Sequence, residues 1–226
     1  MIDRYVAYRH EKGTVQQVDE TVAVEHSLSI QCDGYDHAFL CSPEDLEELA
    51  LGHLKTTGLI SHINDIADIS FEKGHTRVTI RRADTASPRH EHHVPRVKMS
   101  TDDLMSLAPY AMAHSPLFAK TAAFHYAFIF DANATPLQSA CDIGRFNAID
   151  KAVGICLREG LALEGTVLFT TGRIMTLTVK KARNCGIAII VSKAPPTLQA
   201  IESARDAGIS IIGFARGDRY TVYTEE

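Results

Sequence analysis

The order of apolar and polar residues predicts β-structure in the first third of the chain. Leu28, Ile30 and Cys32 alternate with polar neighbours, which is the period-two pattern of a strand with one buried face. Asp33-Gly34 is a hairpin signal, and residues 37–41 follow it as the returning strand. The fourteen residues at the start are polar, and we expect them to be loose.

A helix and two more strands complete this region. Ser42 can cap a helix that has Pro43 in its first turn and ends at Gly58, with leucines at helical spacing between them. The segments 66–72 and 76–82 have the composition and spacing of strands. The first third of the chain is therefore predicted to be a small β-rich unit with one helix.

Residues 83–98 interrupt the periodic pattern. They contain two prolines, so we interpret them as a loop or an inter-domain connection. His90, His92 and His93 also lie here, and a zinc site is one possible interpretation. In an extended segment, however, the third histidine faces away from the other two, and no second group of ligands stands out. We therefore predict no metal site and a solvated polar loop.

Strands and helices alternate in the second half of the chain. Ser100 begins a helix signature, although Pro109 is expected to distort or shorten that helix. Several later strands are apolar on both faces, which is typical of sheet strands covered by helices. The predicted order is strand 124–130, strand 137–141, helix 145–158, strand 166–171, helix 174–184, strand 187–192, helix 197–207, strand 209–214 and edge strand 220–223.

These elements predict an α/β protein with two parts. Residues 15–98 form a small α+β N-terminal domain that is rich in β-structure and ends in the histidine-rich connection. Residues 99–226 form a three-layer α/β domain.

Composition limits the possible partners and location. The net charge of −5 argues against binding to nucleic acid or to an anionic membrane surface, since both need a basic face. The first ten residues lack the apolar core of a signal peptide, so we expect a cytoplasmic protein. Five cysteines without a close pair do not indicate a disulfide framework or a zinc motif.

Arginine recurs where predicted strands end and helices begin. Arg145 and Arg173 each follow a glycine at such a point, and Arg216 follows the strand 209–214. Ligands of wound α/β sheets bind at the carboxyl ends of strands, where helix N-termini attract anions and arginine matches phosphate oxygens. The alternative is that each arginine is a solvated charge or pairs with a nearby acid. The pattern predicts a cradle for an anionic, nucleotide-like ligand, although GxGxxG and GxxxxGK[ST] motifs are absent.

Several short blocks, in order, resemble the FdhD family of formate dehydrogenase accessory sulfurtransferases. The resemblance extends from about Val22 to Tyr223. Its blocks are CSPEDLEELALGHL (41–54), CDIGRFNAIDKAVG (141–154), TTGR (170–173), SKAPPTL (192–198) and IIGFARGDRYTVY (211–223).

The resemblance implies a function and partners. The family moves sulfur from a cysteine desulfurase to the molybdenum (or tungsten) bis-guanine-dinucleotide cofactor of formate dehydrogenase, and its members are homodimers whose second domain resembles the cytidine deaminase fold. The deaminase zinc signature is absent here, so deaminase chemistry is not implied. The family's cofactor segment corresponds to Phe214, Ala215, Arg216, Gly217, Asp218 and Arg219. To these we add, as cofactor-binding residues near a GDP-like moiety, Gly144, Arg145, Asn147, Gly172 and Arg173.

The chain departs from the family pattern at several positions. The family carries a CGxCG-like loop whose cysteine holds the transferred persulfide, whereas residues 83–98 contain no cysteine. The family's glycine pair is Ala122-Ala123, its GRHN histidine is Phe146, and a helix glutamate is Leu177. A persulfide carrier needs a stabilised thiolate. Cys141, close to a helix start, is the weak candidate, and the alternative is a packed core residue.

Three functions are therefore open. The first is sulfur transfer to the cofactor of a formate dehydrogenase. The second is a non-catalytic carrier or chaperone of the cofactor that has lost the persulfide cysteine, and the third is a nucleotide-binding domain with an unrelated role. His125, in an apolar strand, is expected to be a hydrogen-bonded core residue rather than a ligand.

Overall fold

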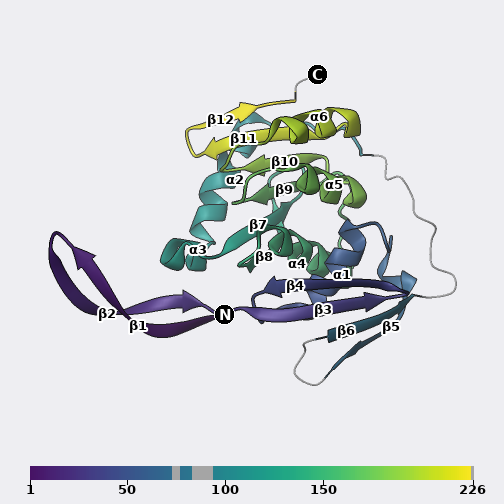
Figure 1. Cartoon of the computed structure of the whole chain (residues 1–226). Helices are drawn as coiled ribbons and strands as arrows, with labels where there is room; N and C mark the ends of the chain where they lie inside the picture. The colour runs from purple at the N-terminus through teal and green to yellow at the C-terminus, as the bar shows by residue number, and fades with distance from the viewer. Residues whose placement is uncertain (73–76, 83–93, 225–226) are drawn as a thin grey trace.

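The chain begins with a β-hairpin that extends away from the rest of the molecule (Figure 1). The computed structural model describes residues 1–72, 77–82 and 94–224. Strands β1 (Ile2–Glu11) and β2 (Thr14–Ala23) pair with each other in a two-stranded sheet and turn at Gly13, whose φ is +83°. The expectation of a loose start is wrong. The hairpin is largely exposed on both faces, so it lacks the one-sided apolar alternation of a buried strand.

A four-stranded sheet and one helix form the N-terminal unit. The sheet has the order β4-β3-β6-β5 and consists of β3 (His26–Cys32), β4 (Tyr35–Cys41), β5 (Ile66–Phe71) and β6 (Arg77–Arg82). Helix α1 (Leu46–Thr56) packs on it through a core that includes Leu28, Ile30 and Leu49, and the short 3-10 helix η1 (Ile63–Asp65) precedes β5. These strands and the helix confirm the pattern predicted for this region.

Helix α1 begins later than expected. Its N-terminal flanking residue is Asp45 rather than Ser42. Ser42 is completely buried and donates from both its backbone N–H and its hydroxyl to Oδ2 of Asp142, at 2.9 and 3.0 Å. The predicted capping role of Ser42 is wrong: its hydroxyl oxygen accepts a hydrogen bond from Lys151 at 2.8 Å rather than from the backbone of α1.

The C-terminal unit is built on a six-stranded sheet with the order β12-β11-β10-β9-β7-β8. Helices α4, α5 and α6 connect β8, β9, β10 and β11, and these connections advance across the sheet in one direction, so they cover one face. Helix α2 contacts β9 and β11 and makes the third layer (Figure 1). The elements are α2 (Thr101–Ala113), α3 (Pro116–Thr121), β7 (His125–Phe130), β8 (Pro136–Asp142), α4 (Arg145–Arg158), β9 (Val167–Thr170), α5 (Thr176–Cys185), β10 (Ile189–Ser192), α6 (Leu198–Ala207), β11 (Ser210–Arg216) and β12 (Arg219–Val222).

The predicted α/β class is confirmed. Two details differ: helix α2 continues through Pro109 to Ala113, and α3 was not expected. The ring of Pro109 is adjacent to Gly217, so it packs against the turn after β11. The likeness to the cytidine deaminase fold and the boundary at residues 98/99 stay predictions.

Helices α1 and α4 join the two units by crossing at a pair of glycines. A Cβ atom on Gly52 would lie 1.7 Å from the carbonyl oxygen of Asp150, and one on Gly154 would lie 1.9 Å from that of Glu48. Only glycine permits this approach of the two backbones. The close crossing positions α4, whose N-terminus lies at the edge of the large sheet.

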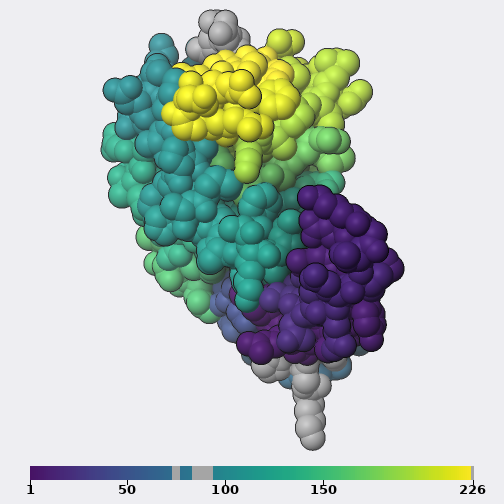
Figure 2. All heavy atoms as spheres, turned by 90° about the vertical axis from the view of Figure 1, so that its left-hand side faces the viewer, coloured from purple at the N-terminus to yellow at the C-terminus, as the bar shows by residue number. Residues whose placement is uncertain are grey.

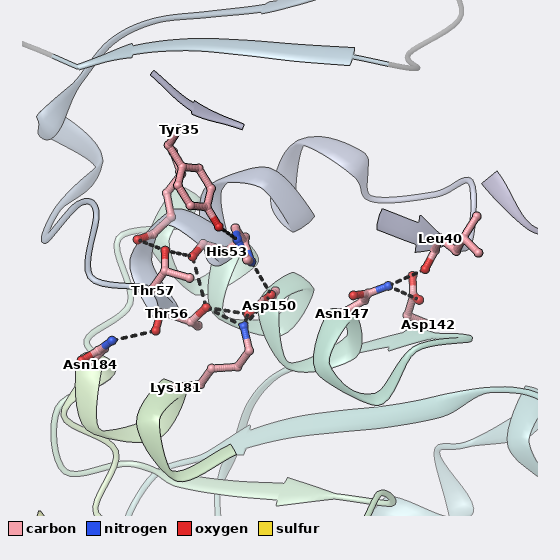
Figure 3. A network of polar contacts seen from close by, with 11 residues as sticks. Tyr35, Leu40, His53, Thr56, Thr57, Asp142, Asn147, Asp150, Lys181 and Asn184 are labelled. Carbon is pink, nitrogen blue, oxygen red and sulfur yellow. Dashed lines mark hydrogen bonds and ion pairs between the residues drawn. The ribbon is translucent and has the colours of Figure 1, made fainter. Parts of the chain in front are cut away.

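Buried polar side chains reinforce this crossing (Figure 3). The Asp150 carboxylate accepts hydrogen bonds from Lys181 at 2.7 and 2.8 Å, from Thr56 at 2.6 Å and from Nδ1 of His53 at 3.1 Å. Tyr35 lies 2.9 Å from the other ring nitrogen of His53. The network therefore links β4, α1, α4 and α5.

Candidate functional site

Four strand ends meet at one edge of the large sheet. β9, β10 and β11 are parallel, and β8 has the same direction because it is antiparallel to β7, which is antiparallel to β9. Their carboxyl ends are followed by Arg145, Arg173, Lys193 and, within β11 itself, Arg216. Figure 2 shows the molecule from the side toward which β11 points in Figure 1, with the yellow β11–β12 turn above and the purple hairpin below. We call this the carboxyl edge.

The arginines of the carboxyl edge have no acidic partners among the described residues. Arg145, Arg173 and Arg216 form no ion pair with a carboxylate in the part of the chain that the structure describes. Arg173 and Arg216 are exposed. Pairing of these arginines with nearby acids, one alternative to a binding role, is therefore wrong. The other alternative, a solvated charge, stays open, and the cradle remains a prediction.

Arg145 is held in a defined position. Its aliphatic stem packs on Gly172, where a Cβ would lie 2.8 Å from Cβ of Arg145. Its guanidinium group is 4.8 Å from the centre of the Phe146 ring and 3.0 Å from the sulfur of Met175. Nε of Arg145 is buried and has no hydrogen-bond partner among the described residues. Among the described residues, the guanidinium group therefore hydrogen-bonds no oxygen atom.

The turn between β11 and β12 presents an aromatic ring. Phe214 has a φ of +50°, which is unusual for a residue with a large side chain, and it is 39% exposed. The pairing of β11 with β12 is irregular between Gly213 and Arg216, so the strand changes direction here. Ala215 is buried, whereas Gly217, Asp218 and Arg219 are exposed. The segment can offer a ring face and arginine donors to the same ligand.

A cavity of about 240 Å³ lies between this turn and α2. Its lining includes Pro109, Met112, Lys193 and Arg216. The ammonium group of Lys193 is 5.3 Å from the centre of the Phe118 ring. Sequence reasoning missed Lys193, although it follows the end of β10 as the predicted arginines follow the ends of β8 and β9.

Asn147 lies in the first turn of α4 but faces the N-terminal unit. It is buried, and its amide donates to the carbonyl oxygen of Leu40 at 2.9 Å and to Oδ1 of Asp142 at 3.0 Å. These bonds give it a structural role, and its predicted contact with a cofactor stays a prediction. Gly144, at the start of α4, donates its backbone N–H to the same Oδ1 at 2.8 Å.

All five cysteines are buried and free. Burial raises the pKa of the Cys141 thiol, although Tyr126 and Lys151 lower it. Burial also raises the pKa of Cys41, Cys156 and Cys185 to about 12, and that of Cys32. A reactive thiol needs the opposite shift. The structure therefore gives the candidate Cys141 the surroundings of a packed core residue.

His90, His92 and His93 lie outside the described residues. Within the described ranges, no group of three or more His, Cys, Asp or Glu side chains is arranged to hold a metal ion. A separate finding concerns the helices: among those described, none combines the length and hydropathy that crossing a membrane requires.

Fold and edge together define a class: a mixed α/β protein with a sheet edge whose arginines form no ion pair among the described residues. The chain belongs to the FdhD/NarQ family, whose model matches residues 23–94 and 80–226. It is 29% identical over 254 positions to "Sulfur carrier protein FdhD" of Listeria innocua, covering 99% of this chain and 97% of the relative. It is 31% identical over 208 positions to "Protein FdhD" of Methanocaldococcus jannaschii, covering 92% and 89%.

A solved structure supports the fold. A protein from Desulfotalea psychrophila, described as a formate dehydrogenase accessory protein, superposes with a TM-score of 0.84 over 99% of this chain and 97% of its own. The two sequences are 24% identical, so this match shows the fold.

The alignments also differ in length. The one with the Listeria relative spans 254 positions, more than the 226 residues of this chain, so that relative contains residues that this chain lacks. The one with the Methanocaldococcus relative spans 208 positions and 92% of this chain, which leaves no room for a comparable insertion.

Proposed function

We propose that this protein is a formate dehydrogenase accessory protein whose carboxyl edge binds the guanine dinucleotide part of the molybdenum (or tungsten) cofactor. Family membership supports the accessory role, since the relatives are FdhD proteins. The arginines at the carboxyl edge, which form no ion pair within the described ranges, are the observation that carries the ligand class, because guanidinium groups match the oxygens of phosphates.

The residues of the edge fit such a ligand. Arg145, Arg173 and Arg216 would hold the phosphates, and the exposed ring of Phe214 offers a face on which a base can stack. The cofactor supplies the metal centre, and this chain supplies binding and orientation.

Sulfur transfer is the role that the names of the bacterial relatives, sulfur carrier proteins, suggest. The family resemblance implies that a cysteine desulfurase would donate the sulfur. A second candidate is a cofactor carrier that transfers no sulfur. The second is favoured by one observation: residues 83–98 contain no cysteine, and the five cysteines elsewhere are buried with raised pKa values.

Binding of GDP, which stands for half of the dinucleotide cofactor, tests the ligand. Isothermal titration calorimetry with wild type and Arg216→Ala should show binding that the substitution weakens by about tenfold or more, as expected for the loss of a charge-assisted hydrogen bond. Equal binding by both proteins, or none by either, would refute the proposed site.

Persulfide labelling separates the two roles. Wild type and Cys141→Ser are incubated with a cysteine desulfurase and ³⁵S-labelled cysteine, and protein-bound label is measured. Label on wild type that is absent from Cys141→Ser would establish sulfur transfer through that thiol. No label on either protein supports the carrier.

We further propose a cytoplasmic homodimer, as the family resemblance implies. The β1–β2 hairpin supports it, because isolated two-stranded hairpins are marginally stable in water and this one exposes Tyr5, Val6 and Tyr8. Sedimentation equilibrium of the full chain and of a Tyr5→Ser/Tyr8→Ser variant tests this. A monomeric wild type would contradict the proposal.

A further inference from the structure

The start of β7 lies between the ends of two other strands. His125, the first residue of β7, pairs across the sheet with Asp142 at the end of β8, and Ala127 pairs with Thr170 at the end of β9. Nδ1 of His125 is 3.3 Å from Oγ1 of Thr171. Arg145 is close enough to lower the pKa of the same histidine. The topology thus brings an imidazole, a guanidinium group and a hydroxyl together at the carboxyl edge.

The hydrogen bonds of Thr171 favour one position for the hydrogen of the His125 ring. The backbone N–H of Tyr126 donates to Oγ1 of Thr171 at 3.0 Å, and Nδ1 of His125, at 3.3 Å, lies where it can accept the hydroxyl hydrogen. Burial and then the charge of Arg145 lower the pKa of His125, although Asp142 raises it, so the ring is neutral at pH 7. A neutral ring that accepts at Nδ1 carries its hydrogen on Nε2.

Both side chains keep donors that the described protein atoms do not use. Nε2 of His125 has no hydrogen-bond partner among the described residues, and the side chain is partly exposed. Nε of Arg145 is also without a partner there, and one of its amino groups has only the weak acceptor sulfur of Met175.

The adjacent carboxylate does not satisfy these donors. Asp142 forms an ion pair with the fully buried Lys151 at 2.7 Å, and its two oxygens also accept from Ser42, Gly144 and Asn147. Its charge is therefore balanced by Lys151, and both of its oxygens are engaged in hydrogen bonds.

We propose that Arg145 and His125, with His125 oriented by Thr171, form a subsite that binds a phosphate or diphosphate group. This inference rests on the proposed function, because it lies on the same carboxyl edge, but it adds a histidine that donates a hydrogen bond without a charge. Helix α4 starts at this point, and Gly144 provides no side-chain cap, so backbone N–H groups of its first turn add to the donors.

Inorganic pyrophosphate and GDP, titrated by calorimetry at pH 7.5, test the subsite. Arg145→Met keeps the stem that packs on Gly172 and should weaken pyrophosphate binding by about tenfold. His125→Phe should weaken it by roughly threefold to tenfold, whereas His125→Gln, whose amide can donate in place of Nε2–H, should stay within about twofold of wild type. Lys180→Ala, which removes an exposed lysine of α5, is the charge control and should change nothing. Circular dichroism melting of each variant confirms folding.

The pH dependence gives a second readout. Because His125 is already a neutral donor, the pyrophosphate affinities of wild type and His125→Gln should change in parallel between pH 7.5 and pH 6.5. A selective strengthening of wild-type binding at the lower pH would show a charged donor and overturn the assignment.

The two proposals fail separately. If GDP binds and Arg216→Ala weakens it, but Arg145→Met and His125→Phe bind both probes as wild type does, the subsite is wrong and the proposed function stands. If pyrophosphate binds through Arg145 and His125 but GDP binds no better than pyrophosphate, the subsite stands and the guanine ligand is wrong. If wild type binds neither probe, both are wrong.

Discussion

Replacement of Lys181 by methionine removes the ammonium group from the buried network between the two units and leaves the Asp150 carboxylate in place. Lys181 and Asp150 are 3% and 1% exposed and lie 2.7 Å apart, so water cannot replace the lost partner. Burial by itself raises the pKa of Asp150, but Lys181 and His53 outweigh burial and hold the pKa below its ordinary value. The carboxylate is therefore charged in the native protein and depends on these partners.

The expected cost follows from this geometry. Removing one partner of a buried ion pair typically costs about 3–5 kcal/mol in free energy of unfolding. For a chain of this size, each kcal/mol lowers the melting temperature by roughly 2–4 °C, so we expect a decrease of roughly 6–20 °C. Protonation of Asp150 relieves the unpaired charge, so the destabilisation should be smaller at pH 5 than at pH 8.

Calorimetric melting and urea unfolding of Lys181→Met measure this effect. Lys180→Met, one residue away and exposed, is the matched control and should change the free energy by less than about 0.5 kcal/mol. The double variant Asp150→Asn/Lys181→Met should recover part of the loss, because an amide carries no charge. A Lys181→Met variant as stable as the control would refute the view that this network fastens the two units together.

Three further outcomes are expected. Gly154→Ala should lower the free energy of unfolding by about 1–3 kcal/mol in urea, because the new methyl group would lie 1.9 Å from a carbonyl oxygen of α1; an unchanged midpoint would contradict the close helix crossing. Gly172→Ala should weaken GDP binding about as much as Arg145→Met does, because the new Cβ would lie 2.8 Å from the stem of Arg145 and displace the side chain. An unaltered affinity for GDP in calorimetry would show that the position of Arg145 does not matter for binding. The pKa of His125 is lowered in the folded state, so its contribution to stability is present above pH 6.5, the ordinary pKa of histidine, and is lost as the pH falls toward the folded value. In urea titrations, His125→Gln should therefore lose less stability than wild type between pH 7 and pH 5. An equal loss in both proteins would show that His125 does not cause the destabilisation at low pH.

Long periodic segments were predictable from the sequence alone. Helix α4 has the predicted limits, Arg145–Arg158, because its apolar positions recur at helical spacing and it begins after a glycine. The β1–β2 hairpin was not predictable in this way, because both of its faces are mostly exposed and neither needs a continuous apolar row. Helix α3 has six residues, too few for a periodic signal.

The candidate site was predictable in part for a similar reason. Strand ends of a parallel sheet share an edge, so arginines that follow strands can be placed together without coordinates. The approach of His125 to Thr171 and Arg145 depends on which strands are neighbours and in which register, and no local pattern carries that information. The contact between Ser42 and Asp142, one hundred positions apart in sequence, was missed for the same reason.

Formate dehydrogenase activity in living cells tests the accessory role most directly. Cells of the source organism that lack this gene are supplied with wild type, Arg216→Ala or the control Lys180→Ala, at equal protein levels, and formate-dependent dye reduction is measured in extracts. The account predicts that activity is lost in the deletion strain, is restored by wild type and Lys180→Ala, and remains low with Arg216→Ala. Full activity in the deletion strain, or full restoration by Arg216→Ala, would contradict it.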